Sequence, residues 1–136
     1  MEEFDKFNVI ILGIIFDPKN KKVLIGRREN DPNIPELTWC FPGGRAVIGE
    51  DVDKTLKKNV QSKTGYIVKN LGTFFSDTYV KKNNLIRIYF LTEVFEGEEK
   101  PNDGFVELKW VHPKELKNHF TTSYHKKLHE YLMNLV

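Results

Sequence analysis

Cysteine is almost absent from this chain, which has one residue of this type, Cys40, among 136. A single cysteine excludes an internal disulfide framework and is typical of a reducing compartment, so we expect a cytoplasmic protein. Long apolar runs are absent too. No stretch approaches the roughly 18 apolar residues of a membrane-spanning helix, and no apolar segment follows a basic N-terminus. We therefore expect neither a membrane span nor a signal peptide.

An excess of charge of one sign is also lacking. The net charge of +2 is too small to predict a nucleic-acid partner, and no basic run is interleaved with aromatic residues. Hydrophobic residues make up 40% and charged residues 29% of the chain, as in an ordinary globular protein. A chain of 136 residues is long enough for one core but not for two. We expect a single domain over residues 1–136.

The most informative stretch is a glycine turn followed by a helical pattern. Residues 42–44, Pro-Gly-Gly, predict a tight turn, because proline fixes one backbone angle and glycine tolerates angles that other residues resist. Beyond Glu50, the apolar residues Val52, Leu56 and Val60 recur every four positions, which predicts one buried helical stripe. Gly65 is a natural helix end.

Strand patterns occupy most of the remaining chain. Runs of β-branched and aromatic residues separated by turn residues predict strands at residues 7–16, 23–25, 66–68, 71–80, 85–95 and 107–111. The first two and the fourth and fifth of these predict hairpins. Two C-terminal helices are expected, one at residues 113–118 and one starting at Thr121 or Thr122. These elements together predict an α+β fold.

Gly44, Glu50 and Gly65 have spacings that resemble the Nudix box, G-x5-E-x7-R-E-U-x-E-E-x-G-U, in which U is aliphatic. Lys58 falls on the arginine of this pattern. The likeness extends over roughly residues 5–135, since the chain also has the family's Arg-Arg strand end, aromatic approach to Pro-Gly-Gly and acid-x-x-Trp strand. The resemblance implies the Nudix fold, a mixed β-sheet sandwiched between α-helices. A domain unrelated to the family would require all these matches to be coincidences.

The three remaining glutamates of the box fall on Asn59, Ser62 and Lys63, which share one helical face. In the family, that face holds Mg²⁺ or Mn²⁺ against a diphosphate. Residues 51–64 here carry two Asp and four Lys, so the segment is net positive. Because an ammonium group repels a cation, we expect the family's usual metal site to be absent.

The turn region resembles most closely that of GDP-mannose mannosyl hydrolases, a branch of the same family. By this resemblance, Arg28 and Arg45 fall where that branch contacts the diphosphate of a nucleotide sugar. Their chemistry agrees, because a planar guanidinium group suits bidentate contact with phosphate. Arg45 also follows Gly43 and Gly44, whose exposed N–H groups would complete an anion-accepting corner.

Three acids are candidates for catalysis or for a relocated metal site. Glu50 has two alternative roles, as a favourable charge or cap at the start of the helix or as a metal ligand by resemblance. Asp103 and Glu107 are the only obvious acids outside the box that could replace the missing glutamates. The alternative for both is a solvated surface charge.

Two functional hypotheses follow from the resemblance. The first is a hydrolase acting on a small-molecule nucleotide or nucleotide sugar, with Mg²⁺ or Mn²⁺ held by Glu50 together with Asp103 or Glu107. The second is a binding module without turnover, in which Lys58 and Lys63 attract phosphate directly. The sequence does not decide between a monomer and a homodimer.

The aromatic residues of the second predicted hairpin are expected in the core or on a sheet face. They are Phe74, Phe75, Tyr79, Tyr89 and Phe90. The resemblance implies that one such ring stacks on a nucleotide base, without identifying which one. His125 and His129 are four residues apart on a predicted helix, but they lack a third ligand, so we do not expect a zinc site.

Overall fold

A computed structural model describes residues 4–32, 37–79, 81–122 and 124–136. In chain order the elements are β1 (Asn8–Asp17), β2 (Lys22–Arg28), β3 (Trp39–Cys40), β4 (Gly43–Arg45), α1 (Val52–Thr64), β5 (Tyr66–Thr78), β6 (Leu85–Gly97), β7 (Phe105–Val111), the 3-10 helix η1 (Pro113–Glu115), α2 (Leu116–His119) and α3 (Lys126–Met133). Val80, the last residue of a predicted strand, lies outside the described residues.

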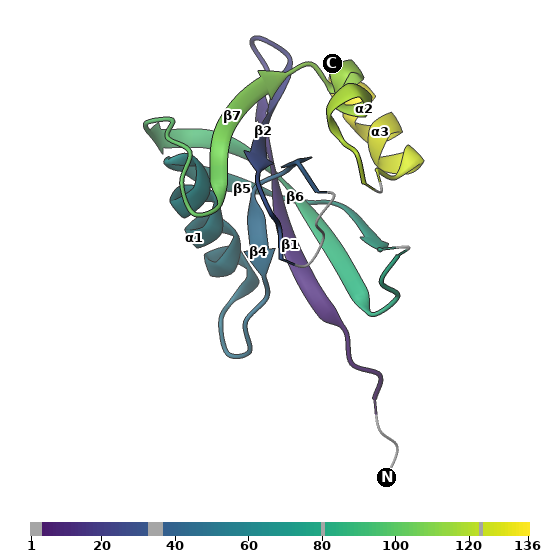
Figure 1. Ribbon diagram of the computed structural model, residues 1–136. Helices are drawn as coiled ribbons and strands as arrows, with labels where there is room; N and C mark the ends of the chain where they lie inside the picture. The colour runs from purple at the N-terminus through teal and green to yellow at the C-terminus, as the bar shows by residue number, and fades with distance from the viewer. Residues whose placement is uncertain (1–3, 33–36, 80, 123) are drawn as a thin grey trace.

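Strand β1 is the centre of a seven-stranded mixed sheet with the order β3-β2-β1-β6-β5, in which β4 also pairs with β1 and β7 with β2 (Figure 1). The pairing of β1 with β6 is parallel. The other pairings are antiparallel, including the two predicted hairpins β1–β2 and β5–β6. Because β4 and β6 flank the same part of β1, residues far apart in sequence meet there.

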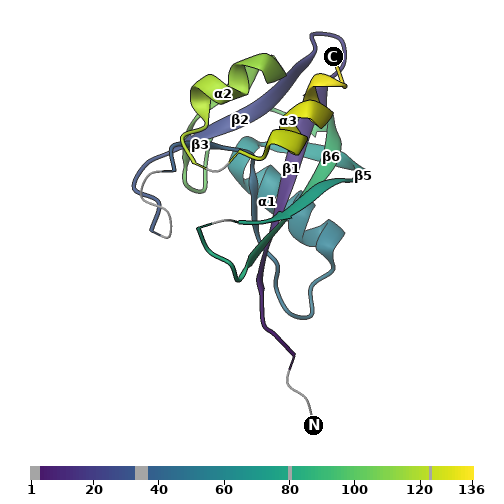
Figure 2. The same cartoon turned by 90° about the vertical axis from the view of Figure 1, so that its right-hand side faces the viewer.

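Helices cover both faces of the sheet, with α1 on one face and α2 and α3 on the other (Figures 1 and 2). Alternate residues of β1 belong to two separate cores, as expected for a strand buried on both sides. Ile11 and Ile15 pack in the core that includes α1, and Ile14 packs in the core that includes α2 and α3. This arrangement confirms the predicted α+β fold.

Helix α1 ends where the sequence predicts, but the residue that caps its start differs from the predicted candidate. The cap is Asp51, whose carboxylate accepts a hydrogen bond from the N–H of Asp53 at 3.1 Å, so Glu50 is not the cap. Leu56 and Val60 are fully buried, and each such side chain contributes about 1.5–3 kcal/mol. Val52, predicted on the same stripe, is 40% exposed because it lies in the first turn.

Gly65 ends the helix in a left-handed conformation, with φ of 82°, as predicted. A Cβ at this position would also collide with the carbonyl oxygen of Glu98. Glycine is therefore required both by the backbone angle and by the close approach of the loop that follows β6.

The last helix starts later than the sequence predicts. It begins at Lys126, because the ring nitrogen of His125 accepts a hydrogen bond from the N–H of Lys127 at 3.0 Å and caps the helix there.

The Nδ1 atom of His129 lies 3.0 Å from the hydroxyl oxygen of Tyr124. In the described part of the chain, no helix has the length and apolar character needed to cross a membrane.

Candidate functional site

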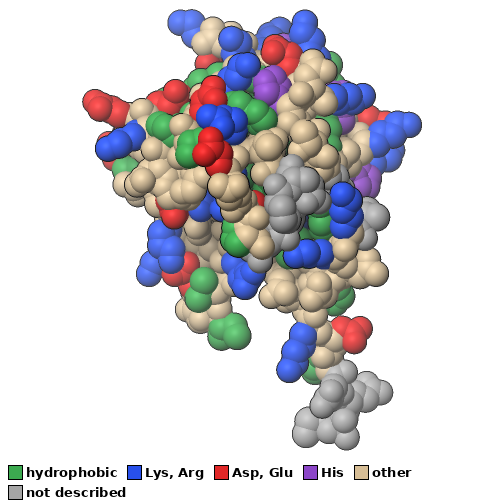
Figure 3. Space-filling view, viewed as in Figure 1, with side chains coloured by type: hydrophobic (Ala, Val, Ile, Leu, Met, Phe, Trp, Pro, Cys, Tyr) green, Lys and Arg blue, Asp and Glu red, His purple; other side chains and the backbone are tan. Residues whose placement is uncertain are grey.

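A cavity of about 460 Å³ opens over the middle of the sheet. Its lining includes Ile10 and Leu12 from β1, and residues from β2, β4, α1, β6 and the segment before α3. Figure 3 shows Lys and Arg side chains on this side of the molecule, interspersed with Asp and Glu. The cavity has two walls of different chemistry.

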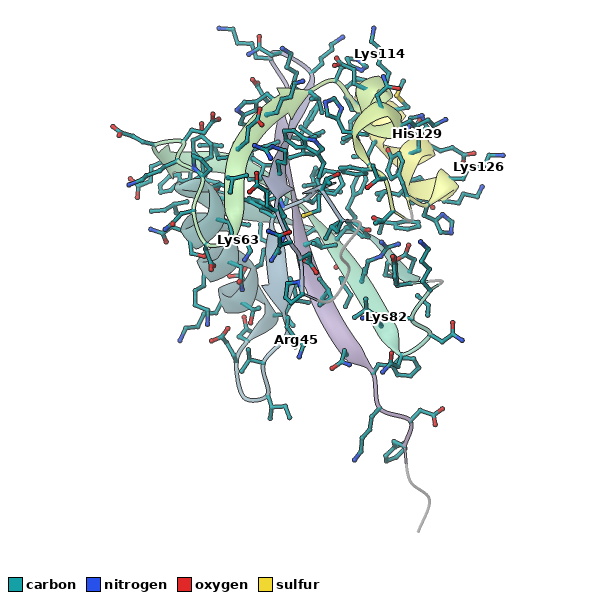
Figure 4. All side chains as sticks on the ribbon, in the orientation of Figure 1. Arg45, Lys63, Lys82, Lys114, Lys126 and His129 are labelled. Atoms are coloured by element: carbon teal, nitrogen blue, oxygen red, sulfur yellow. The ribbon has the colours of Figure 1, made fainter. Side chains whose placement is uncertain are left out.

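The first wall, here called the cationic wall, consists of Arg28, Arg45 and Lys63. These residues come from the end of β2, from β4 and from α1. Arg28 forms an ion pair with Asp31, with Nε and Oδ2 3.2 Å apart. Arg45 is exposed and has no side-chain partner among the described residues. Figure 4 shows Lys63 beside α1 and Arg45 near the end of β4.

The opposite wall, here called the β5–β6 wall, contains Tyr79, Arg87 and Tyr89. The guanidinium group of Arg87 lies over both rings, 4.9 Å from the centre of Tyr79 and 5.8 Å from that of Tyr89. Asp77 accepts hydrogen bonds from Nε and Nη2 of Arg87 at 2.8 and 2.6 Å. The side chains of this ion pair are 11% and 7% exposed, so the pair is almost fully buried.

Strand register fixes the separation of the two walls. Ile10 of β1 pairs with Arg45 on one side and with Arg87 on the other. The two arginine backbones are therefore two inter-strand spacings apart, roughly 10 Å. Ile10 and Leu12 form an apolar floor between them.

Gly43 and Gly44, predicted to contact the substrate, line the cavity, but their local structure differs from the predicted turn. They belong to β4 and pair with Leu12 and Ile11 of β1 instead of forming a free turn. A Cβ on Gly43 would collide with the carbonyl oxygen of Ile11. The glycine is needed for this close approach of two strands.

The helical face that carries glutamates in the Nudix box has a different set of contacts here. Asn59 donates from Nδ2 to the carbonyl oxygen of Thr55 at 2.8 Å. Ser62 donates to Oδ2 of Asp103 at 2.7 Å, and Nζ of Lys63 lies 3.4 Å from the same oxygen. Lys63 alone of the three lines the cavity, and its side chain is only 9% exposed.

Asp103 connects α1 to the loop that precedes β7. It adopts φ of 51°, and its backbone oxygen lies 3.3 Å from Nζ of Lys63. The hydrogen bond from Ser62, and secondarily the charge of Lys63, lower the pKa of the Asp103 carboxyl below its ordinary value. Backbone bonds from Lys100 to Thr64 and from Asn102 to Lys63, at 2.8 and 3.2 Å, hold the same loop.

The predicted catalytic acids are not brought together. Glu50 accepts hydrogen bonds from Thr55 and Lys58 at 2.7 and 2.9 Å, and these bonds lower its pKa. Glu107 accepts from Nε of Arg27 at 2.9 Å. Glu50, Asp103, Glu107 and Lys58 are all absent from the described lining of the cavity.

A divalent cation does not fit these positions. In the described residues, no group of three or more His, Cys, Asp or Glu side chains could hold a metal ion. The box face offers an amide already bonded to the backbone, a hydroxyl and an ammonium group. The metal site predicted for Glu50 with Asp103 or Glu107 stays a prediction, and in this structure each of the three acids is held by a different partner.

For the β5–β6 wall, sequence reasoning named Tyr79 and Tyr89 only among five hairpin aromatics, and it missed Arg87 and its partner Asp77. One signal was available: Arg87 alternates with Leu85 and Tyr89 on one face of an otherwise apolar strand, and Asp77 lies on the facing strand of the same hairpin. Cys40 also lines the cavity, but burial raises the pKa of its thiol to about 12. It is therefore a neutral thiol near pH 7 and a poor nucleophile or metal ligand.

A model of the NUDIX domain matches residues 6–132 of the chain. The chain belongs to the Nudix family. It is 32% identical over 107 residues to the ADP-ribose pyrophosphatase of Methanocaldococcus jannaschii, a match that covers 75% of this chain and 60% of that protein. It is 27% identical over 113 residues to the 8-oxo-dGTP diphosphatase of Buchnera aphidicola subsp. Schizaphis graminum, covering 82% of each.

Solved structures show the same fold at lower identity. The MutT protein of Methanosarcina mazei Go1 superposes with a TM-score of 0.76 at 16% identity, covering 98% of this chain and 96% of that one. A Nudix hydrolase of Nitrosomonas europaea gives a TM-score of 0.73 at 17% identity, covering 95% and 88%. These neighbours confirm the predicted Nudix fold.

Proposed function

We propose that this Nudix chain binds a nucleoside diphosphate, or a nucleoside diphosphate joined to another group, and holds the diphosphate with cationic side chains instead of a divalent cation. The observation that carries the proposal is Lys63. Its nearly buried ammonium group lines the cavity at a position where the Nudix box has a glutamate. The class of ligand is supported by the relatives named above, an ADP-ribose pyrophosphatase and an 8-oxo-dGTP diphosphatase.

Electrostatics favours an anion at the cationic wall. Electrostatic interactions are stronger in partly buried sites than in water, so an ammonium group that is 9% exposed attracts phosphate more strongly than a surface lysine does. The guanidinium groups of Arg28 and Arg45 add donors with the geometry for bidentate contact with phosphate. Lys58, predicted to share this role, lies outside the described lining and pairs with Glu50.

Calorimetric titration tests the proposal directly. The titrants are ADP, ADP-ribose, GDP-mannose and inorganic pyrophosphate, each with EDTA and with Mg²⁺. We expect binding to persist in EDTA and Lys63→Met to weaken it by about tenfold, equivalent to about 1.4 kcal/mol. Lys63→Glu should abolish it. Lys114→Met, on the exposed side of η1, is the control and should bind as the wild type does.

Binding that requires Mg²⁺ would contradict the proposal, and so would an affinity that Lys63→Met leaves unchanged. GDP-mannose is included because the turn region resembles the GDP-mannose mannosyl hydrolases. A preference for it over ADP-ribose would identify a nucleotide sugar as the ligand.

Hydrolysis is the second candidate function, favoured by the diphosphatase and pyrophosphatase relatives. It would require a divalent cation to approach Glu50, Asp103 or Glu107 after these acids leave their present partners. The test is product release from ADP-ribose with Mg²⁺ or Mn²⁺. Turnover that disappears in the double variant Glu50→Gln, Glu107→Gln would support this candidate. Full turnover in that variant would show that these two acids are not the metal ligands.

A further inference from the structure

The hydroxyl of Tyr79 is buried without a hydrogen-bond partner among the described residues. The residue is only 2% exposed. Buried hydroxyls are nearly always paired, because an unpaired one loses its hydrogen bonds to water without replacement. The unpaired Tyr79 hydroxyl therefore needs an explanation. A bound ligand that supplies the missing hydrogen-bond partner is one such explanation.

Tyr79 lines the cavity described above, so a ligand there can approach it. Its backbone N–H donates to the carbonyl oxygen of Leu85 at 2.8 Å, which fixes the residue at the end of the β5–β6 hairpin. Arg87 stacks against the ring from one side. The phenol is thus held in place by backbone and side-chain contacts that leave its hydroxyl unpaired.

The β5–β6 wall suits an uncharged group. The cation among its three residues, Arg87, is paired through two hydrogen bonds with the buried Asp77 carboxylate. Lys82, in the segment between β5 and β6, also lines the cavity and has a partner of its own. Tyr79 and Tyr89 contribute aromatic surface beside this neutralised pair. A flat uncharged ring with polar atoms at its edge matches such a surface, whereas a phosphate matches the cationic wall.

The distance between the walls suits a nucleotide. Strand register separates the Arg45 and Arg87 backbones by roughly 10 Å, with the apolar side chains of Ile10 and Leu12 between them. This span is comparable to the reach of a nucleotide from its diphosphate across the sugar to the base. A ligand bound by its diphosphate at Arg45 and Lys63 would therefore present its base to Tyr79.

We infer that the Tyr79 hydroxyl forms a hydrogen bond with the base of a bound nucleoside diphosphate and makes the site selective for particular bases. This inference rests on the function proposed above, because the cationic wall must first hold the diphosphate. It goes further in assigning a hydrogen bond with the base to the hydroxyl of one residue among the five hairpin aromatics that the sequence did not distinguish.

Replacement of Tyr79 by Phe tests the inference, because it removes only the hydroxyl. We expect the melting temperature of Tyr79→Phe to equal or exceed that of the wild type, since an unpaired buried group has been removed. We expect affinity for the best-bound of ADP, GDP, UDP and CDP to fall about five- to tenfold, the effect of one lost hydrogen bond. Affinity for inorganic pyrophosphate, which has no base, should not change.

Tyr66→Phe is the matched control. The Tyr66 hydroxyl donates to Glu99 at 3.2 Å, and the residue is absent from the described cavity lining. This variant should bind every probe as the wild type does, and its melting temperature should fall slightly because a satisfied hydrogen bond has been lost.

Each alternative outcome overturns the inference in a distinct way. An equal loss for pyrophosphate and nucleotides would show that Tyr79 shapes the cavity instead of contacting the base. A uniform loss across all four nucleotides with pyrophosphate unchanged would assign the hydroxyl to the ribose. If the wild type binds nucleotides and Tyr79→Phe binds them equally well, only the Tyr79 assignment fails. If the wild type binds none of the probes, the proposed function fails with it.

Discussion

Two ion pairs flank the same cavity, and they are built in opposite ways. Arg87 and Asp77 share two hydrogen bonds of 2.8 and 2.6 Å, and both side chains are buried. The Lys63 ammonium and the Asp103 carboxylate approach only to 3.4 Å, and the Asp103 side chain is 54% exposed. The first carboxylate is committed to its arginine, whereas the second is shared between Ser62 and Lys63.

The comparison shows why cationic side chains in one cavity need not have one role. The Arg87 guanidinium is neutralised at short range by the buried Asp77 carboxylate, so it attracts a further anion only weakly. Its role is to stabilise the β5–β6 hairpin and to orient the tyrosines of that hairpin. Lys63 has a long contact to a solvated partner, so an incoming phosphate can compete with Asp103 for it. The distance from each cation to its carboxylate, and the exposure of that carboxylate, distinguish a structural ion pair from a cation that is available to a ligand.

The largest expected effect comes from breaking the buried pair. Asp77→Asn keeps the shape of the side chain but removes its charge, which leaves the Arg87 guanidinium buried without its carboxylate. We expect a loss of about 3–5 kcal/mol in the free energy of unfolding. Urea denaturation followed by tryptophan fluorescence measures it. A loss below about 1 kcal/mol would show that the pair is no more important than an exposed one.

The same substitution in the looser pair should have a much smaller effect on stability. Asp103→Asn should change the free energy of unfolding by less than about 1 kcal/mol, because the carboxylate is largely solvated. It should strengthen pyrophosphate binding about twofold, since Lys63 would no longer be partly neutralised. The measurements are urea denaturation and calorimetric titration.

Asp53→Asn is the control for this effect. The Asp53 carboxylate pairs with Lys57 on the same helix, at 2.9 Å and outside the described lining of the cavity, so its removal should leave pyrophosphate affinity unchanged. Weaker pyrophosphate binding in Asp103→Asn would contradict the comparison, because it would mean that Asp103 positions Lys63 for the ligand instead of competing for it.

The fold was largely predictable because its signals are local. Alternating and four-residue periodicities located both hairpins and α1, and Gly65 marked the helix end. The errors concern features that depend on distant contacts. Residues 42–44 were expected to form a turn, yet Gly43 and Gly44 form a strand because β1 lies beside them. The start of the last helix depends on capping by His125, which helical periodicity does not reveal.

The site was predictable mainly on one side, since Tyr79 and Tyr89 of the other side were named only among five hairpin aromatics. The cationic wall follows from residues within or next to a recognisable pattern, so Arg28, Arg45 and Lys63 could be named from sequence. The β5–β6 wall depends on which residues face each other in a long hairpin. The pairs nearest the turn, Thr78 with Ile86 and Asp77 with Arg87, are in unbroken register, and the three register shifts of β5 lie farther from the turn. The register therefore depends on the exact length of the turn, which the sequence pattern does not fix. The ion pair between Asp77 and Arg87 depends on that register. The position of the unpaired Tyr79 hydroxyl depends on it as well.

The smallest expected effect is the pH dependence of the Asp103 contact. Because the folded-state pKa of Asp103 is lowered from its ordinary value of 3.8, its contribution to stability is fully present above pH 5 and is lost as pH falls through the folded pKa. We expect the backbone amide resonances of Lys100 and Asn102 to shift during this acid titration, as the loop loosens from the end of α1. Nuclear magnetic resonance measures the shifts, and Asp103→Asn should abolish them.

Asp17 provides the matched comparison, because its pKa is also lowered, chiefly by a hydrogen bond from Asn20 in a tight turn. Asp17→Asn should alter the acid titration of residues 19 and 20 and leave that of Lys100 and Asn102 intact. If the amides of the loop instead titrate identically in wild type and Asp103→Asn, the carboxylate does not hold the loop. The weak contact between Lys63 and Asp103 would then be incidental, and Lys63 would be available to a ligand without any competition from this acid.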